Sequence, residues 1–216
     1  MRFRDRREAG RILASRLHYL CGHDPIVVGL SPGGVIVARQ IADALVAPLD
    51  VLLVHKIRAP GFPGAAIGAI GEQDVVVRNQ RIIRALRITP AAFRQAARSA
   101  KADLVQRAAR YHPGHRPLPV AGRPVVLVDD GIVTGATARA AVRVLRARQA
   151  GRIILAVPVA PLEVLRSLSR GVDQTICTLP LVEMTSLGAW YTDFSEVDES
   201  QVPGLLTRRE AEMARR

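Results

Sequence analysis

Two adjacent carboxylates, Asp129 and Asp130, begin a stretch whose residue types could bind a sugar phosphate. After Gly131 and two apolar residues come two threonine hydroxyls and a glycine, in the run Thr134, Gly135, Ala136 and Thr137. If a helix begins in this run, its unpaired backbone N–H groups and the two hydroxyls would form a site for a phosphate. Because carboxylates repel phosphate, we expect the acidic pair to bind hydroxyl groups or a metal. A ribose 5-phosphate carries both the phosphate and the hydroxyls.

The residues on either side indicate how this stretch is held. Residues 125–128 are Val-Val-Leu-Val, which predicts a strand buried on both faces, as in a parallel sheet. A helical pattern follows and runs to about Gln149. The acidic pair would then lie at the carboxyl end of a strand, where open α/β sheets bind ligands. A simpler interpretation is an Asp-Gly turn that caps the helix, but it accounts for only one Asp and one Thr.

Strand and helix patterns alternate along the chain, which predicts an α/β fold with a doubly wound parallel sheet. The predicted strands are residues 26–30, 50–55, 125–128, 152–157 and 174–178. The predicted helices are residues 3–20, 35–47, 80–86, 89–109, a segment ending near 149, and 161–170. Residues 66–70 and 75–77 predict a small β-hairpin extension outside the core.

The whole run from Val125 to Thr137 resembles the phosphoribosyl pyrophosphate (PRPP) motif of type I phosphoribosyltransferases. The resemblance implies one phosphoribosyltransferase-like domain over residues 1–216, with a core at about 24–180. A hood would come from the N-terminal helix and residues 181–216. It implies transfer of ribose 5-phosphate from PRPP to a nitrogenous base, with release of diphosphate, and a homodimer as the default assembly.

The resemblance also assigns roles within the motif. Thr134, Gly135, Ala136 and Thr137, in the turn that begins at Gly131, would take the 5-phosphate, while Asp129 and Asp130 would hold the ribose hydroxyls. Mg²⁺ would be bound mainly through PRPP and water, because the chain offers few dedicated metal ligands. We expect no other metal site.

A second glycine-rich turn, Ser31-Pro32-Gly33-Gly34, follows the first predicted strand. It resembles the family's pyrophosphate loop, in which the N–H groups of Gly33 and Gly34 would hold the leaving diphosphate. Related chains have Pro-Arg-Gly-Gly there, so this chain lacks an arginine contact to the diphosphate. Lys56, at the end of the second predicted strand, would stabilise the growing negative charge. Alternatively, Lys56 is a solvated strand end.

Residues 58–71 contain two prolines and four glycines, which argues against a long helix. The first half of this segment resembles the family's mobile loop, which closes over the active site, and Gly61 and Gly64 would be its hinges. Relatives place an acidic residue near Gly64 or Ala65. Here the nearest carboxylate is Glu72.

Three of the chain's eight aromatic residues lie within residues 190–194. In this family a variable hood holds the base, so Trp190 and Tyr191 could stack on a planar nucleobase. The same residues could equally anchor a terminal segment in an apolar cleft. The sequence leaves both interpretations open.

The net charge of +12 raises the question of nucleic-acid binding. Nearly all of it comes from arginines scattered along the chain, so we expect solvated faces and no specific nucleic-acid partner. No apolar run approaches the roughly 20 residues that span a bilayer, so we expect a cytoplasmic protein without membrane contact. Cys21 and Cys177 lack metal-ligand spacing, and we expect both to be reduced, buried thiols.

These observations favour a phosphoribosyltransferase. The altered turn at Ser31-Pro32 and the missing loop carboxylate motivate a second hypothesis, a PRPP- or nucleotide-binding regulator with weak or no catalysis. The base or other acceptor cannot be identified from the sequence.

Overall fold

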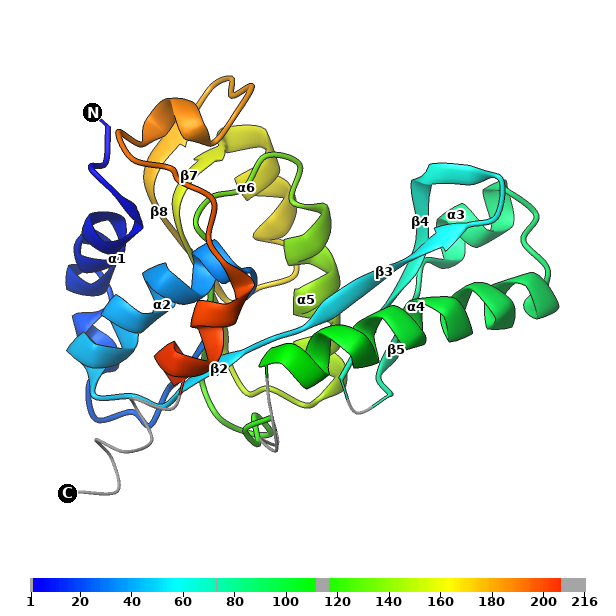
Figure 1. Ribbon diagram of the computed structural model, residues 1–216, viewed down its shortest axis with the longest axis horizontal. Coiled ribbons are helices and arrows are strands. Elements are labelled where there is room, and N and C mark those ends of the chain that lie inside the picture. Colours follow the sequence, from blue (N-terminus) through cyan, green and yellow to red (C-terminus); the bar gives the residue numbers. More distant parts are fainter. Residues whose placement is uncertain (1, 73, 112–116, 207–216) are drawn as a thin grey trace.

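The core of the protein is a five-stranded parallel sheet with the strand order β2-β1-β6-β7-β8 (Figure 1). The computed structural model describes residues 2–72, 74–111 and 117–206. The strands are β1 (Ile26–Gly29), β2 (Leu49–Val51), β6 (Val125–Val128), β7 (Ile153–Pro161) and β8 (Gln174–Leu181). The doubly wound parallel sheet predicted from the sequence is confirmed.

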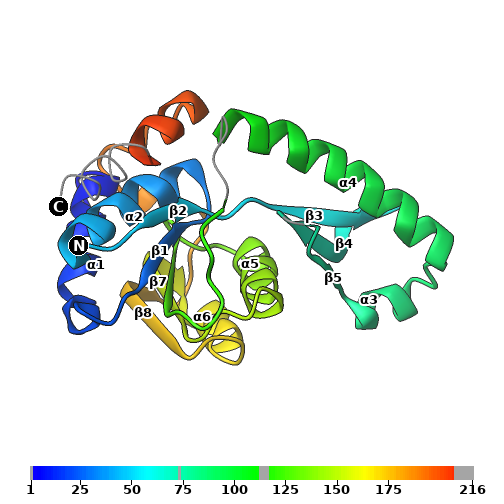
Figure 2. The ribbon, with the colours of Figure 1, turned by 90° about the horizontal axis from the view of Figure 1, so that it is seen from below.

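Helices cover both faces of this sheet, as Figure 2 shows. They are α1 (Arg6–Ser15) and α2 (Pro32–Leu45) on one face, and α5 (Ala136–Ala147) and α6 (Leu162–Leu168) on the other. Each face of the sheet has its own cluster of buried residues, and alternate residues of a strand point to opposite faces. Val126 packs on the α1–α2 side and Leu127 on the α5–α6 side. Burial on both faces is why these strands are nearly continuous apolar runs.

A β-extension protrudes beside α5, and its buried residues continue the apolar core of the α1–α2 side (Figures 1 and 2). It is an antiparallel sheet of β3 (Val54–Ala59), β4 (Phe62–Gly71) and β5 (Val76–Arg78), joined to α3 (Gln80–Ala85) and α4 (Pro90–Tyr111). Ile57 and Ile67 from the strands and Phe93 from α4 are buried. The predicted start of α4 is confirmed, because the Thr89 hydroxyl accepts a hydrogen bond from the Ala92 N–H at 3.2 Å.

Two predictions for residues 50–71 are wrong. The second strand does not run continuously to His55, because β2 ends at Val51 and β3 begins at Val54 in the other sheet. The first half of residues 58–71 is not an open loop, because a turn at Pro60 and Gly61 joins β3 directly to β4. Gly61 has a φ of +76°, which a residue with a side chain rarely adopts. An apolar run does not reveal which sheet it joins.

The N-terminal segment packs against the segment that contains Tyr191. Phe3 precedes α1 and forms a bridge with Tyr191, and their ring centroids lie 5.4 Å apart. Asp5 caps α1 by accepting a hydrogen bond from the Glu8 N–H at 2.7 Å. Short 3₁₀ helices are η1 (His18–Leu20), η2 (Gly188–Trp190) and η3 (Glu199–Gln201).

The cysteines differ from expectation. Cys21 is exposed rather than buried, while Cys177 is half-buried in β8, and both are free thiols. Among the described residues, no helix is long and apolar enough to cross a membrane.

Candidate functional site

The corner between β6 and α5 presents an uncapped helix N-terminus. Its N-cap residue, Gly135, adopts the left-handed conformation (φ +68°) and has no side chain with which to cap the helix. The exposed Thr134 hydroxyl accepts a hydrogen bond from the Ala136 N–H at 3.4 Å, which is a long contact. The first-turn N–H groups beyond it meet no capping side chain among the described residues. This part of the corner can therefore receive an anion.

The acidic pair at the end of β6 packs against the start of α2 and the N-terminal segment. An Asp129 oxygen accepts hydrogen bonds from the Ser31 hydroxyl at 2.5 Å and from the Asp130 N–H at 3.1 Å. Asp130 is 8% exposed, and its carboxylate forms an ion pair with the Arg6 guanidinium at 2.7 Å. In this state both carboxylates face the first turn of α2 and the N-terminal segment.

Desolvation changes the protonation of this pair. It raises the pKa of Asp129 to about 7, and the nearby negative charge of Asp130 adds to the shift, while the Ser31 hydrogen bond opposes it. Desolvation also raises the pKa of Asp130, and Arg6 opposes that shift. The pair can therefore gain or lose a proton near neutral pH.

The glycines of the β1–α2 corner do not form a loop. The sequence predicts a helix from Val35, but α2 begins at Pro32, and Gly33 and Gly34 belong to its first turn. Ser31 is the N-cap, and its side-chain oxygen accepts a hydrogen bond from the Gly34 N–H at 2.9 Å. A Cβ at Gly33 would overlap the Asp130 carboxylate, and one at Gly34 would lie 2.9 Å from Asp129. These glycines are needed because the acidic pair packs on them.

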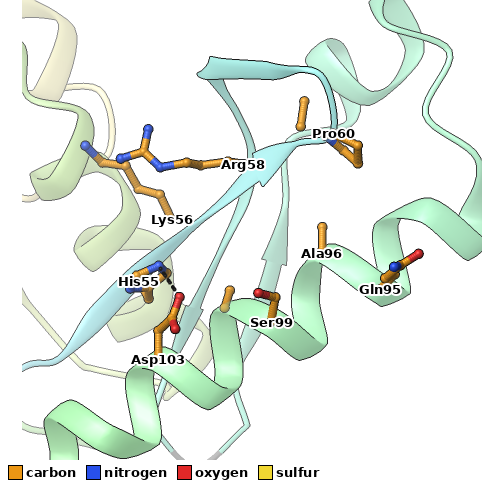
Figure 3. A pocket seen from close by; sticks show the side chains of 10 residues that line it. His55, Lys56, Arg58, Pro60, Gln95, Ala96, Ser99 and Asp103 are labelled. Carbon is orange, nitrogen blue, oxygen red and sulfur yellow. Dashed lines mark ion pairs between the residues drawn. The ribbon is translucent and has the colours of Figure 1, made fainter.

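Lys56 is displaced from its predicted position. It lies within β3, opposite Ala69, and not at the carboxyl end of a core strand. It lines two pockets, one of about 360 Å³ against α4 and one of about 250 Å³ against α5, and neither includes Gly33 or Gly34. Figure 3 shows His55 turned toward Asp103, whose carboxylate oxygen lies 3.5 Å from the His55 Nε2, while Lys56 extends away from both.

The aromatic cluster is chiefly an anchor. Tyr191 is 1% exposed, and its hydroxyl donates a hydrogen bond to the Asp130 carbonyl oxygen at 2.6 Å. Its ring packs 4.9 Å from that of Phe194, over which the Arg6 guanidinium lies at 3.9 Å. In this conformation Tyr191 has no face to offer a base, so its assignment to base stacking is not supported. Trp190 is only partly buried in the same cluster.

Arg6 is the residue that sequence reasoning misses. It contacts Asp130, Phe194 and the Ser195 carbonyl oxygen, yet it stands in an N-terminal arginine run whose pattern predicts solvated side chains. Because 124 positions separate it from Asp130, no local pattern marks the pair. Ser31 stands out in the sequence only as a departure from the family, although the Ser-Pro-Gly-Gly order is a typical N-cap signal.

A parallel α/β sheet with an acidic pair and an open helix N-terminus at one strand end defines a phosphoribosyltransferase-like domain. The family model described as a phosphoribosyl transferase domain matches residues 5–175, and the chain belongs to this family.

Similar proteins support the same assignment. The chain is 40% identical over 212 residues to the Mycobacterium tuberculosis H37Rv protein named "Putative phosphoribosyl transferase Rv0571c", and equally to its counterpart in strain CDC 1551. The match covers 98% of this chain but 48% of those proteins, so the chain spans about half the length of these curated relatives. The crystal structure of TT1426 from Thermus thermophilus superposes with a TM-score of 0.89 at 38% identity, covering 96% of this chain and 99% of that one.

Proposed function

We propose that this protein transfers ribose 5-phosphate from PRPP to a nitrogenous base and releases diphosphate. The observation that carries the proposal is the open N-terminus of α5, which lies at the end of β6 a few residues beyond two carboxylates. Membership of the phosphoribosyl transferase family supports the class of reaction.

In this reaction the bond from C1 of the ribose to the diphosphate oxygen breaks, and a nitrogen of the base bonds to C1. Positive charge develops on the ribose ring as the diphosphate leaves, so the protein must hold the reactants in place and separate the charges. The backbone of residues 134–137 would bind the 5-phosphate. Asp129 and Asp130 would accept hydrogen bonds from the ribose hydroxyls once Arg6 releases Asp130.

Mg²⁺ is part of this proposal and would enter with PRPP. The described residues contain no group of three or more His, Cys, Asp or Glu side chains that could hold a metal ion. Mg²⁺ prefers oxygen ligands and commonly binds through substrate phosphates and water, which suits a site with two carboxylates. When bound, it would neutralise part of the diphosphate charge.

The test is a diphosphate-release assay with PRPP, Mg²⁺ and a panel of purine, pyrimidine and other nitrogenous acceptors. The proposal expects release that depends on one acceptor or a small group of related acceptors. Release that never exceeds the acceptor-free rate would contradict it.

The ion pair between Arg6 and Asp130 favours a second candidate, a PRPP- or nucleotide-binding regulator. A carboxylate already paired at 2.7 Å is less available to a ribose hydroxyl, and Ser31 caps the turn that would hold diphosphate. Calorimetry with PRPP and Mg²⁺ separates the two functions. Tight binding without release for any acceptor would identify the regulator.

A further inference from the structure

Arg6 covers the Asp130 carboxylate from the side of the N-terminal segment. The two groups are 2.7 Å apart, and both side chains are 11% exposed. A second nitrogen of Arg6 donates a hydrogen bond to the Ser195 carbonyl oxygen at 2.9 Å, and the guanidinium lies 3.9 Å from the centre of the Phe194 ring. Arg6 also lies against the first turn of α2, because a Cβ on Gly33 would come within 2.7 Å of its Nε. The arginine therefore occupies the place from which a ligand would reach Asp130.

The backbone that carries Arg6 is fixed in place (Figure 1). Residues 3–4 pair with residues 190–193 through three backbone hydrogen bonds of 3.0, 2.8 and 2.8 Å. The bridge between the two segments joins Phe3 to Tyr191, and both side chains are almost fully buried. Separating the segments would expose two aromatic rings to water, which is costly. The movement that frees the acidic pair is therefore confined to the Arg6 side chain.

A pocket of about 300 Å³ beside Arg6 gives its side chain a second position. The charged residues that line this pocket are Asp5, Arg6, Arg7, Asp193 and Glu196. Hydrogen bonds from Ser195 hold the pKa of Asp193 below its ordinary value, and the charge of Arg6 adds to this effect, so Arg6 is within electrostatic reach of the acidic side of the pocket. An arginine that left Asp130 for this pocket would exchange one carboxylate partner for another.

We propose that Arg6 is a switch that blocks the sugar site while the site is empty. In the closed position Arg6 occupies the Asp130 carboxylate. In the open position it turns into the acidic pocket and leaves Asp130 to a ribose hydroxyl. A ligand that needs Asp130 binds only the open state, so its apparent affinity is reduced by the fraction of molecules that are open. This inference concerns regulation of the site of the proposed function and rests on that function.

The switch predicts an effect of opposite sign to general electrostatics. Removing a positive charge from a protein weakens its attraction for an anion. Arg6→Gln should nevertheless bind ribose 5-phosphate more tightly, because no ion pair then competes for Asp130. Arg11→Gln is the matched control. Arg11 is exposed on α1, so this variant removes the same charge and leaves the ion pair of Arg6 intact.

The experiment is calorimetric titration of the full chain with ribose 5-phosphate. It is run at about pH 8, above the pKa of about 7 of Asp129. Arg6→Gln should raise the affinity about tenfold, as expected if roughly a tenth of the wild-type molecules are open. Arg11→Gln should stay within about twofold of wild type. Unchanged or weaker binding by Arg6→Gln would overturn the proposal.

The Arg6 Nε–H group reports on the switch in the wild-type protein, which covers the case that Arg6→Gln does not fold. In the closed state this group donates a hydrogen bond to Asp130 at 2.7 Å, so its NMR signal should exchange slowly with water. Saturating ribose 5-phosphate should shift the signal and speed its exchange by at least about tenfold. A signal that keeps its position and its slow exchange in the bound protein would overturn the proposal.

The diphosphate-release assay distinguishes this proposal from the proposed function. Tighter ribose 5-phosphate binding by Arg6→Gln, without release for any acceptor, would support the switch and refute the transferase. Acceptor-dependent release, with unchanged ribose 5-phosphate affinity in Arg6→Gln, would support the transferase and refute the switch. Absence of ribose 5-phosphate binding in both the wild type and Arg6→Gln would refute the switch.

Discussion

Two βα corners of the parallel sheet, β1–α2 and β6–α5, begin alike and end differently. Each has a buried strand followed by glycine and a helix. At the β1–α2 corner, Ser31 caps the helix, and the acidic pair packs on Gly33 and Gly34. At the β6–α5 corner, the helix begins at a left-handed glycine without a side-chain cap. The first corner is closed by its own side chains, and the second is open.

The difference shows that glycine after a strand does not by itself make an anion site. The N–H groups of a helix start are available to a ligand only when no side chain has taken them. The sequence already contains this distinction: Ser-Pro precedes the glycines of the closed corner, while Thr-Gly-Ala begins the helix of the open one. Four predictions test it, from the largest effect to the smallest.

Asp130→Asn should give the largest effect, a loss of transferase turnover of at least about a hundredfold, because the ribose hydroxyls would lose a charged acceptor. The matched variant is Arg6→Gln, which breaks the same ion pair but keeps the carboxylate. Both should lower the melting temperature, since the pair is nearly buried. Only Asp130→Asn should abolish turnover in the diphosphate-release assay. If both variants lost turnover equally, the role of Asp130 would be structural.

The raised pKa of Asp129 should make stability depend on pH. The folded protein holds this proton up to about pH 7, whereas the unfolded chain releases it near its ordinary value of 3.8. The free energy of unfolding should therefore fall as the pH rises from about 4 to 7, by at most about 1.4 kcal/mol per pH unit. Urea unfolding at several pH values measures this slope.

Asp129→Asn should make that slope shallower. Glu72 is the control. Burial raises its pKa to about 7 as well, but Glu72 directly follows β4 and belongs to neither of the two corners. Glu72→Gln should remove only its own share of the slope. An unchanged slope in Asp129→Asn would mean that the carboxyl is not desolvated in the folded state.

Ser31→Ala and Thr134→Ala should separate the two corners. Losing the Ser31 cap should cost about 1 kcal/mol, within the usual range of about 0.5–2. Thr134→Ala should leave stability within about 0.5 kcal/mol of wild type, because Thr134 is exposed. The affinity for ribose 5-phosphate should fall mainly in Thr134→Ala. If calorimetry showed the loss of ribose 5-phosphate affinity in Ser31→Ala, and urea unfolding showed the loss of stability in Thr134→Ala, the closed corner would be the phosphate site.

Tyr191→Phe should give the smallest effect, a loss of about 1 kcal/mol from the missing hydrogen bond to the Asp130 carbonyl. Apparent affinity for a base should stay unchanged, because the ring is buried. Trp190→Ala is the companion test: weaker base binding in this variant, with normal PRPP binding, would give Trp190 the stacking role. Loss of base binding in Tyr191→Phe would contradict the anchoring role.

Much of the core could be predicted from the sequence, because its signals are local. The apolar runs of β1 and β6, the Thr89-Pro90 helix start and the turn before α5 each occupy a few consecutive residues. Burial on both faces and helix capping leave a direct mark on residue type.

The remaining features depend on partners far away in the chain. Nothing near Val54 indicates that β3 leaves the parallel sheet to pair with β4, since both environments accept the same apolar residues. Arg6 and Asp130 are 124 positions apart, and Tyr191 reaches the same aspartate from a third segment. The contacts that close the acidic pair, from Arg6 to Asp130 and from Ser31 to Asp129, therefore leave no local signal in the sequence.

The central claim is that the β6–α5 corner, and not the β1–α2 corner, holds the sugar phosphate. Backbone amide NMR of the protein titrated with ribose 5-phosphate tests it directly. We predict that the largest chemical-shift changes fall on the amides of residues 135–138, with small changes at Gly33 and Gly34. The largest changes at Gly33 and Gly34, with residues 135–138 unaffected, would contradict the claim.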